Sequence, residues 1–167
     1  VYEFEDAYGV MAPTWYDEAL YVQRAYHGPD TQLWCFDEAD GSVLWSSPHT
    51  AQWETYYAPA VADGKVWVNG GSYGGMYGFD AYTGAELFYK SLAQYDEWTP
   101  AWADGVLYSW VEGELVAYDP DTGAPSWALD LGWDWRGWSM ETAPVVDADS
   151  AYLISTTGLH AVDLKTG

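Results

Sequence analysis

The sequence contains very little positive charge. Its 167 residues include 5 Lys and Arg against 26 Asp and Glu, which gives a formal net charge of -21. A chain this acidic repels phosphate backbones and anionic lipid headgroups. We therefore expect no nucleic-acid partner and no attraction to acidic membrane surfaces.

Cysteine is equally scarce, because Cys35 is the only one in the sequence. The chain cannot form an internal disulfide, and a domain of this size can bury roughly 70% of its unfolded surface without one. Cys35 stands between Trp34 and Phe36 in a strand-like run. This position predicts a buried, unreactive thiol rather than a nucleophile.

Long apolar runs and metal-binding spacings are also lacking. There is no stretch of 18 apolar residues, and the first thirty residues have neither the basic nor the apolar segment of a signal peptide. We expect no membrane span and no leader in this sequence. His27, His49 and His160 lack metal-ligand spacing with each other or with Cys35, so no metal site is predicted.

Aromatic residues, in contrast, are abundant. The 12 Trp, 15 Tyr and 4 Phe make up 19% of the chain, and 49% of all residues are hydrophobic. Disordered chains have few aromatics and low hydrophobic content. The length and composition therefore predict one folded domain with a sizeable core.

Two short motifs recur along the whole chain. In the first, an Asp is followed four residues later by a Gly, and successive Asp residues are 43, 39 and 44 positions apart. In the second, Ala or Thr precedes a Pro, and the prolines are 46, 41 and 44 positions apart. The prolines are Pro13, Pro59, Pro100 and Pro144. A shared period of about 40 to 45 residues is typical of helical arrays or of propeller blades.

The pattern within each unit favours strands over helices. Residues 59–62 and 65–68 flank Asp63-Gly64, a two-residue hairpin signal, and residues 76–79 and 86–89 are two further short strand-like runs. No segment carries a long apolar stripe at helical spacing. Four antiparallel strands in each unit form the blade of a β-propeller, so we predict an all-β propeller with four repeats present.

The motif Asp-x-x-(Thr or Asp)-Gly-x-x-x-Trp runs from Asp37 to Trp45 and from Asp119 to Trp127, and Phe88 replaces the Trp in a third unit. Together with (Ala or Thr)-Pro-x-x-x-Asp-Gly, it resembles the tryptophan-docking repeat of PQQ-like, or quinoprotein-like, β-propellers. The resemblance covers essentially the whole chain and is specific for the fold rather than for a function. The absence of an adjacent Cys pair favours the non-catalytic branch of the family.

The resemblance implies a structural role for each position of the motif that recurs in this chain. The Asp accepts hydrogen bonds from backbone N–H groups of the turn, the Gly supplies a positive φ, and the aromatic residue packs between adjacent blades. The residues assigned to these roles are Asp37, Gly41, Trp45, Asp80, Gly84, Phe88, Asp119, Gly123, Trp127, Asp163 and Gly167.

Cutting the chain after each turn Gly gives repeats 1–41, 42–84, 85–123 and 124–167 of a single, partial propeller domain. This frame puts Phe4 at the docking-aromatic position, so residues 1–4 are expected to be an outermost strand. The resemblance implies a ring of seven or eight blades, of which this chain is a piece. A closed four-bladed ring and two chains completing one eight-bladed ring are the alternatives.

The loops expected at one face of the propeller are rich in aromatic residues. Flat rings offer a large contact area at low entropic cost, which suits a binding surface. Packing between blades is the competing interpretation for any single ring, and segment 132–138, with three Trp around one Arg, is the strongest candidate for binding. The candidate binding-face residues are Tyr26, His27, Trp53, Tyr73, Trp98, Trp133, Trp135, Arg136 and Trp138.

The sequence therefore favours a non-catalytic scaffold that binds a protein or glycan through an aromatic, acidic face. It lacks the adjacent Cys pair that the resemblance associates with catalytic quinoproteins. We expect no catalytic residue and no cofactor, and a periplasmic, secreted or cell-surface location.

Two other functions stay open. In the first alternative, the chain is a fragment of a PQQ-dependent oxidoreductase, with PQQ and calcium bound outside this segment. In the second, it is a carbohydrate-binding or adhesive propeller. Further blades of the same chain or a second copy are possible partners.

Overall fold

The computed structural model describes residues 9–10, 12–25, 31–48, 50, 58–70, 75–92, 99–111, 113–132, 143–155 and 158–165. All regular secondary structure in these ranges is β-strand. The prediction of an all-β fold is confirmed. No helix in the described part of the chain is long and apolar enough to cross a membrane.

The strands form four antiparallel sheets, which we call blades 1 to 4 in chain order. Blade 1 contains β1 (Gly9–Val10), β2 (Thr14–Tyr16), β3 (Ala19–Ala25), β4 (Gln32–Asp37) and β5 (Val43–Ser46). Blade 2 contains β6 (Ala60–Ala62), β7 (Lys65–Asn69), β8 (Gly75–Asp80) and β9 (Glu86–Ser91). Blade 3 contains β10 (Ala101–Ala103), β11 (Val106–Val111), β12 (Glu114–Tyr118) and β13 (Pro125–Asp130). Blade 4 contains β14 (Val145–Val146), β15 (Ser150–Ser155) and β16 (Gly158–Asp163).

Within each blade, strands that follow one another in the sequence pair with one another. Blade 1 differs slightly, because β1 and β2 both pair with β3 and form two pieces of one innermost strand. The break between them contains Pro13, which has no N–H to contribute to a sheet.

Tight turns join the first two strands of the blades. Asp63 and Gly64 have φ values of 48° and 70°, and Asp104 and Gly105 have 47° and 80°. Two consecutive positive φ values define the hairpin turn whose twist matches that of paired strands, and the Asp-Gly sequence favours it. The hairpin predicted at Asp63-Gly64 is confirmed, and blade 3 has the same turn at Asp104-Gly105.

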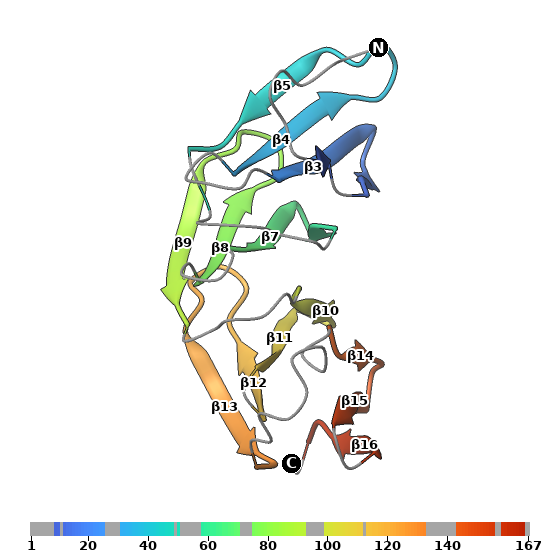
Figure 1. Cartoon of the computed structure of the whole chain (residues 1–167), viewed down its shortest axis with the longest axis vertical. Helices are drawn as coiled ribbons and strands as arrows, with labels where there is room; N and C mark the ends of the chain where they lie inside the picture. Colours follow the sequence, from blue (N-terminus) through green and yellow to red (C-terminus); the bar gives the residue numbers. More distant parts are fainter. Residues whose placement is uncertain are drawn as a thin grey trace.

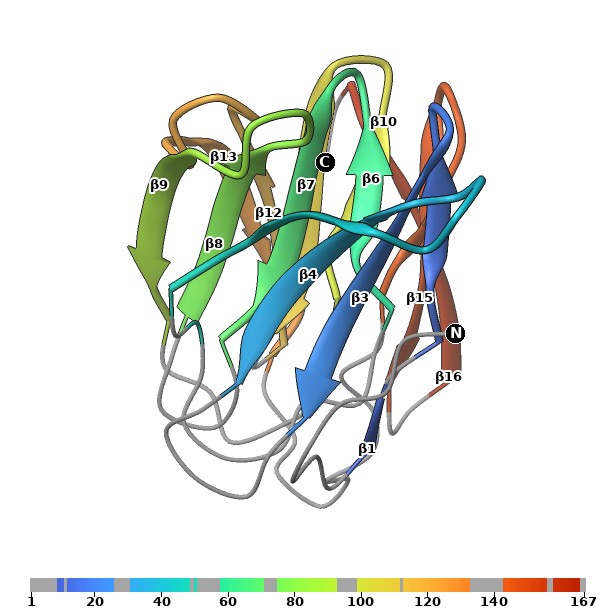
Figure 2. The ribbon, with the colours of Figure 1, turned by 90° about the horizontal axis from the view of Figure 1, so that it is seen from above.

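The four blades lie side by side along an open arc (Figure 1). The outermost strands β5, β9 and β13 follow its convex side, and blades 1 and 4 stand at its two ends. Seen from above, the hairpin turns of the blades gather at one end of the strands (Figure 2). The described residues thus form an open arc rather than a closed four-bladed ring.

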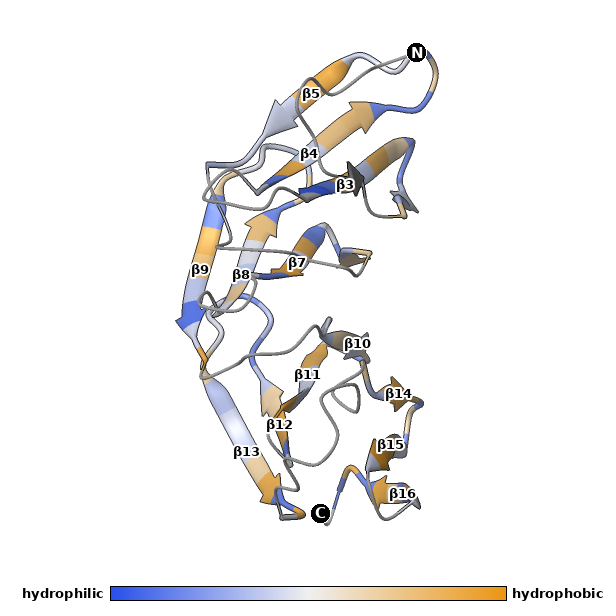
Figure 3. Cartoon of the chain, viewed as in Figure 1, coloured by the Kyte–Doolittle hydropathy of each residue, from blue (hydrophilic) through white to orange (hydrophobic). Residues whose placement is uncertain are grey.

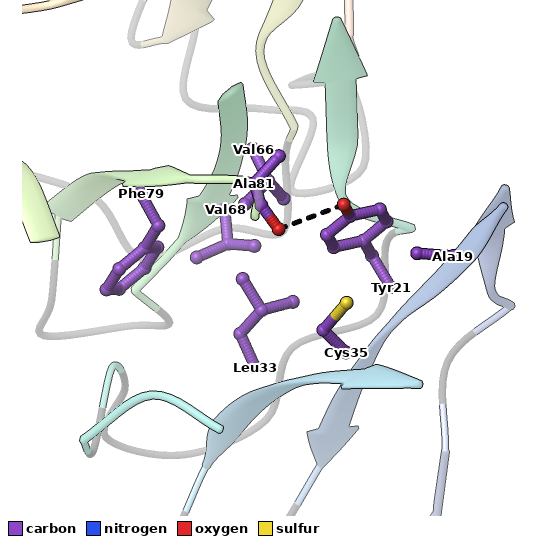
Figure 4. Close-up of a cluster of buried hydrophobic side chains, with 8 residues drawn as sticks. All are labelled: Ala19, Tyr21, Leu33, Cys35, Val66, Val68, Phe79 and Ala81. Atoms are coloured by element: carbon purple, nitrogen blue, oxygen red, sulfur yellow. Dashed lines mark hydrogen bonds between the residues drawn. The ribbon is translucent and has the colours of Figure 1, made fainter. Parts of the chain in front are cut away.

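The core consists of three apolar layers, one between each pair of neighbouring blades. Between blades 1 and 2, side chains such as Tyr21 and Leu33 from blade 1 face Val66, Val68 and Phe79 from blade 2 (Figure 4). Apolar residues recur along β4, β7 and β11, whereas β9 carries polar residues at both ends (Figure 3). The middle strands of blades 2 and 3 are apolar because neighbouring blades cover both of their faces, whereas β4 of blade 1 packs, among the described residues, on blade 2 alone.

Candidate functional site

The repeated Asp organises the turn that leads into the outermost strand. In blade 2, Asp80 Oδ1 accepts hydrogen bonds from the backbone N–H groups of Tyr82 and Thr83 and from the Thr83 hydroxyl. Gly84 closes the turn with a φ of 70°, and its N–H donates to the Asp80 carbonyl at 2.9 Å. The Thr83 hydroxyl and these N–H groups hold the pKa of Asp80 below its usual value.

The turns of the other blades follow the same plan with small differences. Asp119 Oδ1 accepts from the N–H and hydroxyl of Thr122, which lower its pKa, and Gly123 has a φ of 64°. In blade 1 the Thr position is Asp40, and Asp37 Oδ1 accepts from the N–H of Ala39. Gly41 again has a positive φ, of 75°.

In blade 4 the turn begins at Asp163, whose Oδ1 accepts from the N–H of Lys165 at 2.8 Å. Gly167, which the repeat assigns to this turn, lies outside the described residues.

Each turn glycine of blades 2 and 3 lies under an aromatic ring of the preceding blade. A Cβ added to Gly84 would stand 2.6 Å from Cδ2 of Trp45, and one added to Gly123 would stand 2.5 Å from Cδ2 of Phe88. Only a residue without a side chain allows the rings this close. Trp127 packs in the apolar layer between blades 3 and 4, against Tyr108 at a ring separation of 6.1 Å.

A small residue stands opposite each of these rings on the neighbouring strand. Cys35 pairs with Trp45, Gly78 with Phe88, and Ala117 with Trp127. A Cβ on Gly78 would come within 2.5 Å of Phe88 Cε1, so this ring lies between two glycines, Gly78 and Gly123. Because the residue opposite is small, the aromatic ring has room to lie across the neighbouring strand.

Hydrogen bonds to one backbone carbonyl add to each contact. Trp45 Nε1–H and the Tyr21 hydroxyl both donate to the Ala81 carbonyl, at 2.9 and 3.0 Å. Phe88 has no such donor, and in its blade Trp67 Nε1–H donates to the Pro120 carbonyl at 3.1 Å. Ala81 and Pro120 each directly follow the turn Asp. Trp67 stands at the strand position of Tyr21, so the carbonyl in blade 3 keeps one of the two hydrogen bonds that its counterpart Ala81 accepts.

One ion pair also joins neighbouring blades. Lys65 Nζ lies 3.5 Å from Asp63 Oδ2 in its own blade and 3.2 Å from Asp121 Oδ1 in blade 3. Burial alone would lower the pKa of Lys65, but the two carboxylates outweigh it and raise this pKa. Asp121 therefore acts in a contact between blades, and the Asp119-x-Asp121 pair serves turn and interface structure.

The single cysteine is inaccessible. Cys35 is 1% exposed, and burial raises the pKa of its thiol to about 11. Burial likewise raises the pKa of the neighbouring Tyr21, which is also 1% exposed. A neutral thiol packed beneath Trp45 is a poor nucleophile, so Cys35 serves packing.

None of the nine predicted binding-face residues lies in the described part of the chain: Tyr26, His27, Trp53, Tyr73, Trp98, Trp133, Trp135, Arg136 and Trp138. Whether they converge on one face stays a prediction. The structure does describe the strand ends from which their segments start, such as Ala25 and Gln32 in blade 1 and Asn69 and Gly75 in blade 2.

Buried polar residues fix these strand ends, and the sequence analysis did not single them out. Gln23 is 2% exposed and donates from Nε2 to the carbonyl of Asn69 in the next blade at 2.9 Å. Thr50 donates from its backbone N–H to the Thr31 carbonyl at 2.9 Å, and both residues are buried. The sequence does carry one sign of them, because amide side chains, Gln23 and Asn69, stand at the same strand position of blades 1 and 2.

Reactive polar groupings are few in the described ranges. Ser155 Oγ and His160 Nε2 are 2.7 Å apart on paired strands of blade 4. No group of three or more His, Cys, Asp or Glu residues within these ranges could hold a metal ion. Asp147, one of the acidic residues near the last hairpin, accepts from the N–H groups of Asp149 and Ser150 and so caps a turn.

The repeated turns, the aromatic rings and the arc of antiparallel sheets define a β-propeller of the PQQ-like repeat class. Residues 6–167 match the family model described as outer membrane protein assembly factor BamB. The chain belongs to this family.

Solved structures agree with this fold. BamB from Moraxella catarrhalis superposes with a TM-score of 0.73 at 21% identity, over 90% of this chain and 47% of that one. The computationally designed Ika4 protein gives a TM-score of 0.73 at 18% identity, over 96% of this chain and 94% of that one. Quinohemoprotein alcohol dehydrogenase from Comamonas testosteroni gives 0.69 at 18% identity, over 98% and 34%.

The chain spans about half the length of the BamB chain that it resembles. No curated protein matches the sequence. At these identities the likeness to solved structures establishes the fold.

Proposed function

We propose that this chain is a non-catalytic, extracytoplasmic scaffold that binds a protein partner in the assembly of outer membrane proteins. The observation that carries this proposal is the family match over residues 6–167, which covers nearly the whole chain. The description of that family names an assembly factor and no enzyme.

The chemistry of the described residues supports a scaffold. Their most reactive group, the Cys35 thiol, is buried with a raised pKa, and the Asp residues of the repeat are held by turn N–H groups. Hydrogen bonds between blades, such as that from Gln23 to Asn69, fix the ends of the strands on which the candidate loops stand. A rigid frame lowers the entropic cost of binding through such loops.

The binding experiment compares two sets of aromatic residues at different places in the chain. One variant replaces Trp133, Trp135 and Trp138 of the candidate loop by Ala. Its control replaces Trp15 and Tyr82, which are 60% and 59% exposed beside the hairpin turns, by Ala. Both variants remove large aromatic side chains, but only the first removes candidate binding residues.

The probe is a purified, urea-unfolded outer-membrane β-barrel protein carrying a fluorophore, diluted into the wild-type chain and followed by anisotropy. We expect saturable binding that weakens at least tenfold in the loop variant and stays within about twofold in the control, with both variants melting as the wild type does. Absence of saturable binding by the wild type, or equal binding by the loop variant, would overturn the proposal. Loss of cooperative melting in the loop variant would assign these rings to the core instead.

A fragment of a quinoprotein oxidoreductase is the second candidate, because 98% of this chain superposes on a quinohemoprotein alcohol dehydrogenase. The residues present do not fit the cofactor: the sequence has one cysteine instead of an adjacent pair, and no described cluster could hold calcium. Titration with PQQ and Ca²⁺, followed by absorbance, tests whether this segment itself carries a cofactor site. We expect no stoichiometric bound-cofactor band, whereas such a band would support the oxidoreductase.

A further inference from the structure

One face of blade 4 is exposed at positions that are buried in every other blade. The turn Asp fixes the comparison, because Tyr21, Trp67, Tyr108 and Tyr152 each pair with the residue two before it. The first three are 1%, 0% and 5% exposed, whereas Tyr152 is 38% exposed. In blades 1 to 3 this face is covered by the following blade.

Two neighbouring positions repeat the contrast. Leu159 stands four residues before the turn Asp and is 73% exposed, whereas its counterparts Leu33, Met76 and Leu115 are each 0% exposed. Ile154 is 51% exposed, whereas its counterparts Gln23, Asn69 and Trp110 are 2%, 5% and 4% exposed. Tyr152, Ile154 and Leu159, which we call the trailing face, thus form the apolar half of an unfilled contact between blades.

Blade 1 carries the matching half at the other end of the arc (Figure 1). Its turn glycine, Gly41, has no atom of the described residues within 4 Å of an added Cβ, whereas Gly84 and Gly123 lie under rings. Leu20 and Val22 occupy the positions with which Val66 and Val68 face the preceding blade. Leu20 is partly exposed and Val22 is 8% exposed, whereas Val66 and Val68 are 0% and 1% exposed. Leu20, Val22 and Gly41 are the leading face.

We propose that the trailing face of one chain packs on the leading face of a second copy, so that two copies close one ring through two equivalent contacts. A second copy offers the matching half at each open end, because both faces carry the positions that pack together between the other blades. This four-bladed arc superposes on 47% of the BamB chain with a TM-score of 0.73. Two such arcs supply the extent of one BamB chain. A head-to-tail contact gives a closed ring when its rotation closes and an open filament when it does not.

The repeat also specifies a polar contact for this interface. The Tyr21 hydroxyl and Trp67 Nε1–H donate to the carbonyl that follows the turn Asp of the next blade. The corresponding pair across the proposed interface is the Tyr152 hydroxyl of one copy and the Glu38 carbonyl of the second copy. In the single chain the Tyr152 hydroxyl lies 3.2 Å from Asp147 Oδ2, an exposed contact.

Sedimentation equilibrium of the 167-residue chain tests the proposal directly. The expected result is a single species with twice the 18.6 kDa mass of one chain. The variant Leu159→Glu places a charge on the trailing face and is expected to sediment at the mass of one chain. The control Leu87→Glu, at a position 39% exposed on β9, is expected to keep the doubled mass. Far-ultraviolet circular dichroism checks that both variants stay folded.

Three outcomes would overturn the proposal. A wild-type chain that sediments as a monomer at tens of micromolar would leave the trailing face to a further blade of a longer chain. Species of growing mass would show that the contact does not close a ring. A doubled mass that persists in both Leu159→Glu and a second trailing-face variant, Ile154→Glu, would place the contact elsewhere.

Discussion

The indole ring of Trp45 lies directly on Gly84 of the next blade. An added Cβ at Gly84 would be 2.6 Å from both Cδ2 and Cε3 of this ring. The contact joins the outermost strand of blade 1 to the turn before the outermost strand of blade 2. Because Phe88 and Gly123 make the same contact one blade further on, a single relationship explains why an aromatic residue and a glycine recur together.

Gly84→Ala is therefore expected to destabilise the protein more than Gly105→Ala. Both glycines have a positive φ, of 70° and 80°, so each substitution carries backbone strain of about 1 to 2 kcal/mol. Gly105 has no described atom within 4 Å of an added Cβ, so its substitution adds no clash. Urea unfolding measures both costs, and equal values would contradict the ring contact.

The carbonyl that follows the turn Asp predicts coupling between Trp67 and Phe88, because in blade 1 it accepts from both corresponding positions, Tyr21 and Trp45. Trp67→Phe removes the N–H that reaches the Pro120 carbonyl and is expected to cost about 1 to 3 kcal/mol. Phe88→Trp would restore a donor at the position that Trp45 uses in blade 1. We expect Phe88→Trp to be more favourable in the Trp67→Phe background than in the wild type, by about 0.5 kcal/mol or more. A double-mutant cycle that is additive would refute the shared role.

The Cys35 thiol is expected to stay unreactive in the folded protein. It is 1% exposed, and burial raises its pKa to about 11, so almost no thiolate exists at pH 8. Ellman's reagent should release less than a tenth of an equivalent of chromophore within an hour from the native chain. In guanidinium chloride it should release one equivalent within minutes. Rapid reaction in the native state would show that β4 is accessible.

The turn carboxylates predict an acid-sensitive part of the stability. The Thr83 hydroxyl and N–H hold the pKa of Asp80 below its unfolded value of about 3.9. A lowered folded pKa stabilises the protein above the unfolded pKa, and this stabilisation is lost as the pH falls through the folded pKa. The free energy of unfolding that Asp80 contributes should therefore begin to decrease at about pH 4 and be lost once the pH is below the folded pKa.

Asp80→Asn measures this contribution, because the amide cannot titrate. The difference in unfolding free energy between wild type and Asp80→Asn should favour the wild type at pH 6 and shrink between pH 4 and pH 3. Glu86→Gln on the exposed outer strand serves as a control for the loss of one negative charge. A difference that does not change with pH would contradict the prediction.

The strands were predictable because the motifs recur every 39 to 46 residues and the turn signals are local. Asp63-Gly64 fixes a hairpin by backbone conformation alone, and the apolar runs on either side can only be short strands. The function of Trp67 was not predictable, because its partner, Pro120, lies 53 positions away. Likewise, the small residues opposite the rings become meaningful only once the pairing of β4 with β5 is known.

The role of the candidate binding face could not be predicted from the sequence. A pattern of Trp and Tyr in loops indicates binding or packing, and only contacts between side chains separate the two. Trp133 and Trp135 lie outside the described residues, so their role rests on the binding experiment. The acidic turns illustrate the opposite case, since Asp147 and Asp80 are explained by the N–H groups that they accept from.

We infer that the aromatic ring of one blade and the turn glycine of the next act as one unit that holds neighbouring blades together. The measurement that tests it most directly is the unfolding free energy of Gly84→Ala in a Trp45→Ala background. Without the indole, the new methyl group meets no ring, and the substitution should cost only the backbone strain that Gly105→Ala shows. If Gly84→Ala costs as much without Trp45 as with it, the two residues are independent and the account of the repeat is wrong.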